Sequence, residues 1–375
     1  MRRALDPDAE SLADIPDFDV GLAYRLYQAL LAPTVDTWRP RREIVLVADG
    51  PLGQLPFSLL PTEPTETGAD TAIPFDRYTR VAWLARSHAV TVMPTVTSLA
   101  ALRALPAIGG KEPFIGFGDP VFSTEQLAAA PPQEAPGAVT TRGVKLHLRS
   151  VPRLRGVDAA ELALLPRLPD TAEEIRAMAE TMHADMAQDV FVGKSASETT
   201  VRNAPLRDYR VVAFATHGLV PGDLTGLTEP ALALTAPAVS GGQAEDGLLT
   251  MGEIFELKLD AEWVVLSACN TGTAAGASAE AVSGLGRAFF YAGTRALLVS
   301  NWPVETSSAR ALTTDVFSRQ TADPTIGRAE ALRQAHVALI DGPGYRDPAS
   351  GKPLFSYAHP IFWAPFTLIG DGARR

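Results

Sequence analysis

Residues 264–272 read Val-Val-Leu-Ser-Ala-Cys-Asn-Thr-Gly, and they contain the chain's one cysteine, Cys269. The apolar run that opens this stretch is typical of a buried strand, and the Asn-Thr-Gly that closes it is typical of a tight turn. A second stretch, residues 211–218, reads Val-Val-Ala-Phe-Ala-Thr-His-Gly. Each stretch therefore predicts a strand that ends in a reactive side chain, His217 in one and Cys269 in the other.

Around these two stretches, apolar strand-like runs alternate with helix-like runs along the chain. This alternation predicts an α/β fold with a mainly parallel sheet. Further strands are expected at residues 44–48, 81–84, 89–93, 114–118, 190–192, 231–234, 296–300 and 366–369. Helices are expected from Ser98, from Thr171, from Ser197, near Met251, and over residues 280–291, 305–317 and 326–340.

Residues 120–165 show no clear periodicity. They are rich in Pro and Ala at first and then become basic, with Arg142, Lys145, Arg149, Arg153 and Arg155. A loop of this length inside a compact domain is usually functional or disordered. It is either a solvated insertion or a regulatory or cleavable loop, because exposed basic segments are open to proteolysis.

Composition limits the functional classes. The chain has 375 residues and a formal net charge of −10, which argues against a nucleic-acid-binding surface because phosphate contacts need a basic face. No apolar run approaches the roughly 18 residues of a membrane span, and the acidic N-terminus lacks a signal-peptide core. A cytoplasmic protein that binds neither nucleic acid nor membrane is expected. One cysteine forms no internal disulfide and no thiolate zinc site.

If the strands at 211 and 264 are neighbours in a parallel sheet, His217 and Cys269 emerge at the same sheet edge, where ligands bind. A free thiol titrates near ~8.5, so a nearby imidazole is needed to take its proton during attack and return it to the leaving amine. The backbone N–H groups of Gly218 and Cys269 are expected to form an oxyanion hole. The alternative is a structural His-Gly turn and a buried cysteine.

These two motifs resemble the His and Cys motifs of CHAT domains, which are relatives of caspases and separases. The roughly 50 residues between His217 and Cys269 are also typical of caspase-type enzymes, although the local Gln-Ala-Cys-x-Gly signature is not met. Further resemblance runs from about residue 20 to 371, including Asp49 to Leu52, Gly118 to Pro120, Asn301 to Val304 and Trp363 to Phe366.

The resemblance implies a caspase–hemoglobinase-like three-layer sandwich and peptide-bond hydrolysis through a thioacyl intermediate, without a metal or a cofactor. It also implies a non-catalytic, caspase-like N-terminal portion over residues 1–109, followed by the peptidase domain over residues 110–375. CHAT domains often follow helical repeats that sense a signal. No such repeat occurs here, so we expect a separate activator or sensor, or a chain that is part of a longer protein.

The resemblance places Asp119 and Ser267 at the pocket for the substrate residue before the scissile bond (P1). Asp119 is expected either to select Lys or Arg or to be a simple turn residue. Ser267 stands where basic-specific metacaspases have Asp. This difference argues against a basic P1 residue and is compatible with an apolar one. Trp302 is expected either to wall a substrate groove or to lie in the core.

Three functions compete on the sequence alone. The first is an active endopeptidase that cuts a protein partner, in a bacterial signalling, defence or cell-death pathway. The second is a catalytically silent CHAT scaffold that acts by binding, against which the presence of both His217 and Cys269 speaks. The third is another thiol or serine hydrolase, which is disfavoured because residues 281–285 do not form a G-x-S-x-G elbow.

Overall fold

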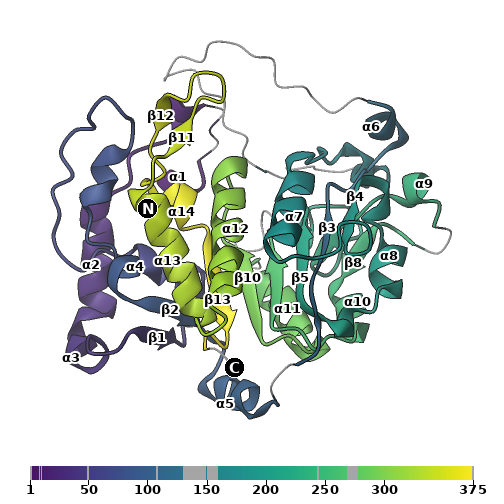
Figure 1. Cartoon of the computed structure of the whole chain (residues 1–375), viewed down its shortest axis with the longest axis horizontal. Helices are drawn as coiled ribbons and strands as arrows, with labels where there is room; N and C mark the ends of the chain where they lie inside the picture. The colour runs from purple at the N-terminus through teal and green to yellow at the C-terminus, as the bar shows by residue number, and fades with distance from the viewer. Residues whose placement is uncertain are drawn as a thin grey trace.

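An eight-stranded sheet forms the centre of the protein in a computed structural model of the chain (Figure 1). The structure describes residues 2–7, 9, 11–48, 50–106, 109–129, 149, 159–242, 245–267 and 278–373. The strand order is β1-β2-β13-β10-β9-β5-β3-β4. The strands of this sheet are β1 (Glu43–Leu46), β2 (Ala89–Val92), β3 (Glu112–Gly118), β4 (Val190–Val192), β5 (Tyr209–Ala215), β9 (Trp263–Leu266), β10 (Ala296–Ser300) and β13 (Phe366–Gly370).

The sheet is parallel except at one junction. Strands β10, β9, β5, β3 and β4 are parallel to one another, and so are β1, β2 and β13. The two groups meet where β13 pairs with β10 in the antiparallel sense. The predicted mainly parallel α/β sheet is therefore confirmed.

Helices cover both faces of the sheet. On β5, Val211 and Ala213 pack into one core with helices α7 and α12, whereas Val212 and Phe214 pack into a second core with α8, α10 and α11. This alternation follows from the two-residue period of a strand, and it produces three layers. The helices are α1 (Arg2–Leu5), α2 (Val20–Leu30), α3 (Val35–Trp38), α4 (Leu84–Ser87), α5 (Val96–Ala104), α6 (Thr124–Ala128), α7 (Asp170–Thr181), α8 (Glu198–Asn203), α9 (Pro237–Ser240), α10 (Met251–Glu256), α11 (Ser278–Ala292), α12 (Thr306–Ala322), α13 (Arg328–Asp341) and α14 (Pro360–Trp363).

Two small antiparallel sheets complete the described fold. Strands β6 (Gly218–Leu219), β7 (Ala231–Ala233) and β8 (Leu248–Thr250) form one, directly after the end of β5. Strands β11 (Tyr345–Arg346) and β12 (Pro353–Phe355) form the other. The first of these sheets begins one residue after His217, a predicted site residue.

The N-terminal residues join the same central sheet. Strands β1 and β2 pair with each other, and β2 pairs with the C-terminal strand β13. The purple and dark blue N-terminal elements lie beside the yellow C-terminal ones in Figure 1. The division at residue 109 and the caspase-like character of the portion before it stay predictions.

Most expected elements are present with shifted ends, and two differences are informative. Residues 81–84 do not form a strand; α4 begins at Leu84, and Trp83 forms only an isolated bridge with Pro61. The helix expected from Thr171 begins at Asp170, and its N-cap is Pro169, without a side-chain cap. Thr171 instead donates its hydroxyl to the carbonyl of Leu168, at 2.7 Å.

Glycines in β3 allow α7 to pack closely on the sheet. A Cβ atom on Gly118 would lie 2.9 Å from Cγ1 of Ile175 and 3.0 Å from the carbonyl oxygen of Thr171, both on α7. A Cβ on Gly116 would lie 2.8 Å from Cγ2 of Ile175. Such distances are shorter than ordinary contact, so any larger residue at either position must push α7 away.

We therefore expect Gly118→Ala to destabilise the fold by about 1–3 kcal/mol, because the added methyl meets backbone as well as side-chain atoms. Urea unfolding followed by circular dichroism measures this. Gly109→Ala is the matched control, since a Cβ there meets nothing within 4 Å. Equal free energies of unfolding for the two variants would contradict the close packing of α7 on β3.

Candidate active site

The strands that lead to His217 and Cys269 are neighbours. β5 and β9 pair in parallel, with Phe214 opposite Leu266, and the N–H of Ser267 donates to the carbonyl of Phe214 at 3.0 Å. The condition under which both motifs emerge at one sheet edge, that the two strands are neighbours, is therefore met. Cys269 lies outside the described residues; it follows Leu266 by three positions, just as His217 follows Phe214 by three.

His217 is held firmly at the end of β5. Its backbone carbonyl accepts from the N–H of Ala233 on β7 at 2.9 Å, so the small antiparallel sheet fixes the main chain. Its ring is fully buried, and the Nε2 atom lies 2.7 Å from the carbonyl oxygen of Pro166. The Phe122 ring packs against the imidazole, with a centroid distance of 5.7 Å.

These contacts determine the protonation of the ring. A backbone carbonyl only accepts hydrogen bonds, so Nε2 carries the proton and Nδ1 presents a lone pair in the neutral ring. The Nδ1 atom is buried and has no hydrogen-bond partner among the described residues. Burial lowers the pKa of His217, and the charge of Arg149 lowers it further, whereas the Pro166 carbonyl and Asp170 raise it. A neutral imidazole with a free lone pair is the form that a general base requires.

The other predicted oxyanion-hole residue, Gly218, begins β6. It is buried and pairs with Leu232 of β7. The second donor of the expected hole is the backbone N–H of Cys269, which lies outside the described residues. The oxyanion hole therefore stays a prediction.

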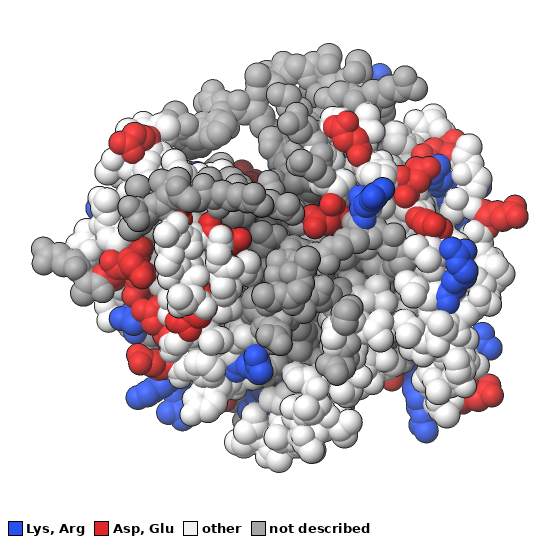
Figure 2. Space-filling view, turned by 180° about the vertical axis from the view of Figure 1, so that it is seen from behind, with Lys and Arg blue, Asp and Glu red and all other residues white. Residues whose placement is uncertain are grey.

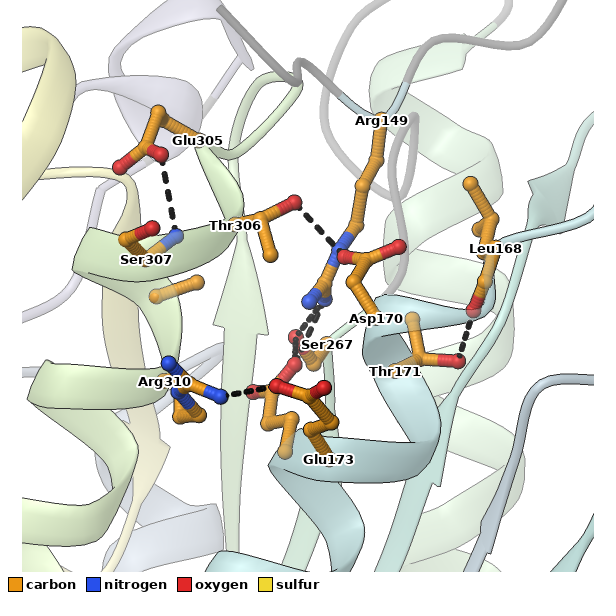
Figure 3. Close-up of polar contacts among 12 residues, drawn as sticks. Arg149, Leu168, Asp170, Thr171, Glu173, Ser267, Glu305, Thr306, Ser307 and Arg310 are labelled. Atoms are coloured by element: carbon orange, nitrogen blue, oxygen red, sulfur yellow. Dashed lines mark hydrogen bonds and ion pairs between the residues drawn. The ribbon is translucent and has the colours of Figure 1, made fainter. Parts of the chain in front are cut away.

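Ser267 follows β9 directly and takes part in a buried polar network. Its hydroxyl accepts from Nη1 of Arg149 at 3.0 Å and donates to Oε2 of Glu174 at 3.1 Å. The same Nη1 atom lies 2.6 Å from Oε2 of Glu174, and the Nε atom of Arg149 lies 2.9 Å from Oδ2 of Asp170. Figure 3 shows Arg149 reaching between helices α7 and α12 towards Ser267. The network brings one guanidinium and two carboxylates to the edge of the sheet that carries His217.

Asp119 lies just beyond the end of β3, and its carboxylate is already engaged. Both oxygens accept from Arg167, each at 2.8 Å, in a two-pronged ion pair. Its backbone has a φ of 51°, a left-handed conformation that Asp tolerates at turns. A basic substrate side chain would have to displace Arg167 to reach it. Selection of Lys or Arg by Asp119 stays a prediction.

Trp302 lies in the main hydrophobic core and is only 3% exposed. Its indole N–H donates to the backbone carbonyl of Ile361 at 3.2 Å. This position agrees with the core alternative, and a role in a substrate groove would need the ring to leave its pocket. Aromatic side chains with a buried N–H usually find such a partner.

One family of known proteins matches most of the chain. The CHAT domain family matches residues 20–371, which is nearly the whole chain. The chain belongs to the CHAT family of caspase-like peptidases. The resemblance seen in the two motifs is confirmed.

Curated relatives of this CHAT domain include tetratricopeptide repeat protein 28 of Mus musculus and of Homo sapiens. Each is 28% identical over 131 residues, which is 34% of this chain. The match spans only 5% of the mouse protein and 4% of the human protein. The match therefore lies within one small part of each much longer protein.

The surface and the helices of the CHAT domain give two further observations. On the face shown in Figure 2, the described acidic and basic side chains are interspersed. No helix in the described ranges has both the length and the apolar character that a bilayer crossing demands. The expected absence of nucleic-acid and membrane partners stays a prediction, as does the cytoplasmic location.

Sequence patterns did not identify four residues that shape this edge of the CHAT domain: Arg149, Pro166, Asp170 and Glu174. Arg149 is one of several basic residues in an aperiodic stretch, and no local pattern marks which of them is buried. Glu174 has the pattern of an ordinary acidic residue at a helix start, although it is fully buried. The apolar Ile175 beside it and Met178 one turn later are local signals that this side of the helix faces inward.

The environment of His217 predicts its titration. Its pKa should lie below the ordinary value of 6.5, because burial disfavours the charged ring more than Pro166 and Asp170 favour it. The neutral form should therefore persist as the pH falls below 6.5. Because the folded-state pKa is the lower one, His217 contributes stability that is complete above the unfolded value and is lost as the pH falls through the folded value.

NMR of imidazole C–H resonances, assigned with His217→Gln, measures this titration. The chain has six histidines, so the assignment by one variant is practical. A midpoint at or above 6.5 for His217 would contradict the buried neutral ring.

Proposed function

We propose that the chain is a cysteine endopeptidase that hydrolyses a peptide bond in a protein partner. Cys269 acts as the nucleophile and His217 as the base. The supporting observation is the parallel pairing of β5 and β9, together with a buried, neutral His217 whose Nδ1 has no described partner. The CHAT family membership agrees with this function.

The reaction begins when Nδ1 of His217 takes the proton from Sγ of Cys269 as the sulfur attacks the peptide carbonyl carbon. The N–H groups of Gly218 and Cys269 stabilise the negative charge on the carbonyl oxygen. When the C–N bond breaks, the His217 imidazolium gives its proton to the leaving amine. Water, deprotonated by His217, then attacks the thioester, so that the carboxylic acid leaves and the thiol is restored.

The Pro166 carbonyl supports both roles of His217. It orients the ring through Nε2 and stabilises the imidazolium that forms during the reaction, because its hydrogen bond strengthens when the ring is charged. Burial of the ring, with Phe122 packed against it, disfavours the charged form before the reaction begins. A neutral resting state and a stabilised charged intermediate are what an acid–base residue needs.

The partners follow from the same proposal. A protein substrate is cut, and a separate activator or a helical-repeat sensor controls access. The pathway is bacterial signalling, defence or cell death, and the location is the cytoplasm. No metal or cofactor takes part in the proposed reaction.

A second candidate is a catalytically silent CHAT scaffold that acts by protein–protein binding. The observation that favours it is the match to tetratricopeptide repeat proteins, since such repeats commonly bind other proteins. The two candidates differ in one respect only, namely whether Cys269 reacts.

Cleavage of a random-peptide library, analysed by mass spectrometry, separates the two candidates. We expect cuts from the parent chain that are absent with Cys269→Ala, in the presence of the activator where one is needed. The identity of the residue before each cut gives the P1 preference. Identical spectra from the two proteins would reject the peptidase and favour the scaffold.

Replacement of the base gives an independent prediction. His217→Gln should lower kcat by about 10²–10⁴-fold with a smaller change in KM, because proton transfer is lost while the substrate site remains. His183→Gln is the control, since His183 lies on a different part of the chain just after α7. A kcat within a few fold of the parent for His217→Gln would remove His217 from the mechanism.

A further inference from the structure

Arg149 occupies an acidic pocket between α7 and α12. Its side chain is 1% exposed, and its guanidinium lies among Glu174, Asp170 and Ser267. Figure 3 shows the side chain of Arg149 pointing towards Ser267, with Asp170 beside it. The pocket therefore already binds a guanidinium group, the group that a substrate arginine would present.

The acidic walls of the pocket are fixed by contacts that do not involve Arg149. The hydroxyl of Thr306 donates to Oδ2 of Asp170 at 2.7 Å, and the hydroxyl of Thr313 donates to Oε1 of Glu174 at 3.3 Å. Both threonines lie on α12, whereas both carboxylates lie on α7. Two packed helices thus hold the carboxylates in place for whichever cation enters between them.

The backbone of Arg149 is bound as well as its side chain. Its N–H donates to the carbonyl of Val304 at 3.2 Å, in the loop that follows β10. Extended peptides bind to proteins in this way, with main-chain hydrogen bonds for affinity and a side-chain pocket for specificity. Arg149 is therefore held as one residue of a bound peptide would be held.

The pocket also lies beside the reactive centre. Ser267, at its base, follows β9 and precedes Cys269 by two positions. The charges of Arg149 and Asp170 are near enough to His217 to shift its titration. A residue whose side chain filled this pocket would have its backbone close to the sheet edge where the chemistry is proposed.

We propose that this pocket is the P1 site for an arginine side chain, and that Arg149 fills it as an internal ligand that competes with substrate. The proposal rests on the proposed peptidase function and names its substrate class. It assigns basic selectivity to Glu174 and Asp170 rather than to Asp119, whose carboxylate already binds Arg167. Ser267 accepts one N–H of the guanidinium, so a serine at this position is compatible with a basic residue.

A nearby ion pair provides the matched control. Arg310 on α12 pairs with Glu173 on α7, so it joins the same two helices (Figure 3). Its side chain is 42% exposed and that of Glu173 is 64% exposed, whereas Arg149 and Glu174 are 1% and 0% exposed. Removal of the Arg149 side chain should open an enclosed acidic pocket. Removal of the Arg310 side chain should not, because Glu173 is exposed.

The test measures binding of N-acetyl-arginine methylamide by calorimetry to Cys269→Ala and to Cys269→Ala/Arg149→Ala. The double variant should bind the arginine compound roughly tenfold or more tightly than Cys269→Ala does, because the internal competitor is gone. It should also bind the arginine compound roughly tenfold or more tightly than the uncharged citrulline analogue. Cys269→Ala/Arg310→Ala should gain no affinity, and adding Glu174→Gln to the Arg149→Ala protein should abolish the preference for arginine over citrulline.

Equal affinities for arginine and citrulline, or no gain on removing Arg149, would overturn the pocket. Circular dichroism verifies the fold of each variant. If Arg149→Ala does not fold, Arg149→Gln replaces it, because its amide can still donate to Glu174. Arginine must then bind to that variant more tightly than to Cys269→Ala.

Because these binding measurements use Cys269→Ala, they do not depend on catalysis. Cleavage of the library by the parent chain without a preference for arginine before the cut would overturn the assignment of this pocket as the P1 site. That result would support the peptidase function. Binding of the arginine compound without cleavage of any peptide would support an arginine-binding pocket and reject the peptidase function.

Discussion

The parallel pairing of β5 with β9 is the constraint on which the functional edge depends. Phe214 lies opposite Leu266, so the residues that follow these two strands leave the sheet at the same level. His217 is one of them, and Cys269 stands at the corresponding position in the chain. The flanking strands β3 and β10 deliver Asp119 and Val304 to the same side, because all four strands are parallel. One direction of pairing thus gathers the proposed base, a polar network and the Val304 carbonyl that accepts from Arg149.

Helix α7 places two carboxylates beside this edge of the sheet. The absence of a Cβ at Gly116 and Gly118 lets Ile175 settle directly on β3. This close approach places Asp170 and Glu174 beside the end of β9. Two buried carboxylates need a positive partner, and Arg149 supplies it. A neutral His217 near this compensated cluster keeps its proton acceptor available, whereas an uncompensated pair of carboxylates would favour the charged ring.

The fold could be predicted from the sequence further than the site could. The apolar runs at residues 211–215 and 264–267 each predict a strand, because a parallel strand that is buried on both faces appears in the sequence as a short, continuous apolar run. The reversal of β13 and the burial of Arg149 depend on contacts between residues far apart in the chain, which no local pattern contains. Asp119 shows the same limit: its turn conformation follows from its neighbours, but its ion pair with Arg167 depends on how the loop before α7 folds back. His217 could be singled out because a strand-end His-Gly is a local signal, whereas its contact with Pro166 could not.

The most direct test of the central claim uses the single thiol of the chain. The rate of alkylation of Cys269 by iodoacetamide, measured from pH 5 to pH 9, reports how readily that thiol loses its proton, without knowledge of any substrate. If His217 is the base, the parent chain should react roughly tenfold or more faster than His217→Gln at pH 6.5, and its profile should reach half-maximum below the ~8.5 of a free thiol. Superimposable profiles for the two proteins, both with a midpoint near ~8.5, would show that the imidazole does not act on the thiol and would contradict the proposed dyad.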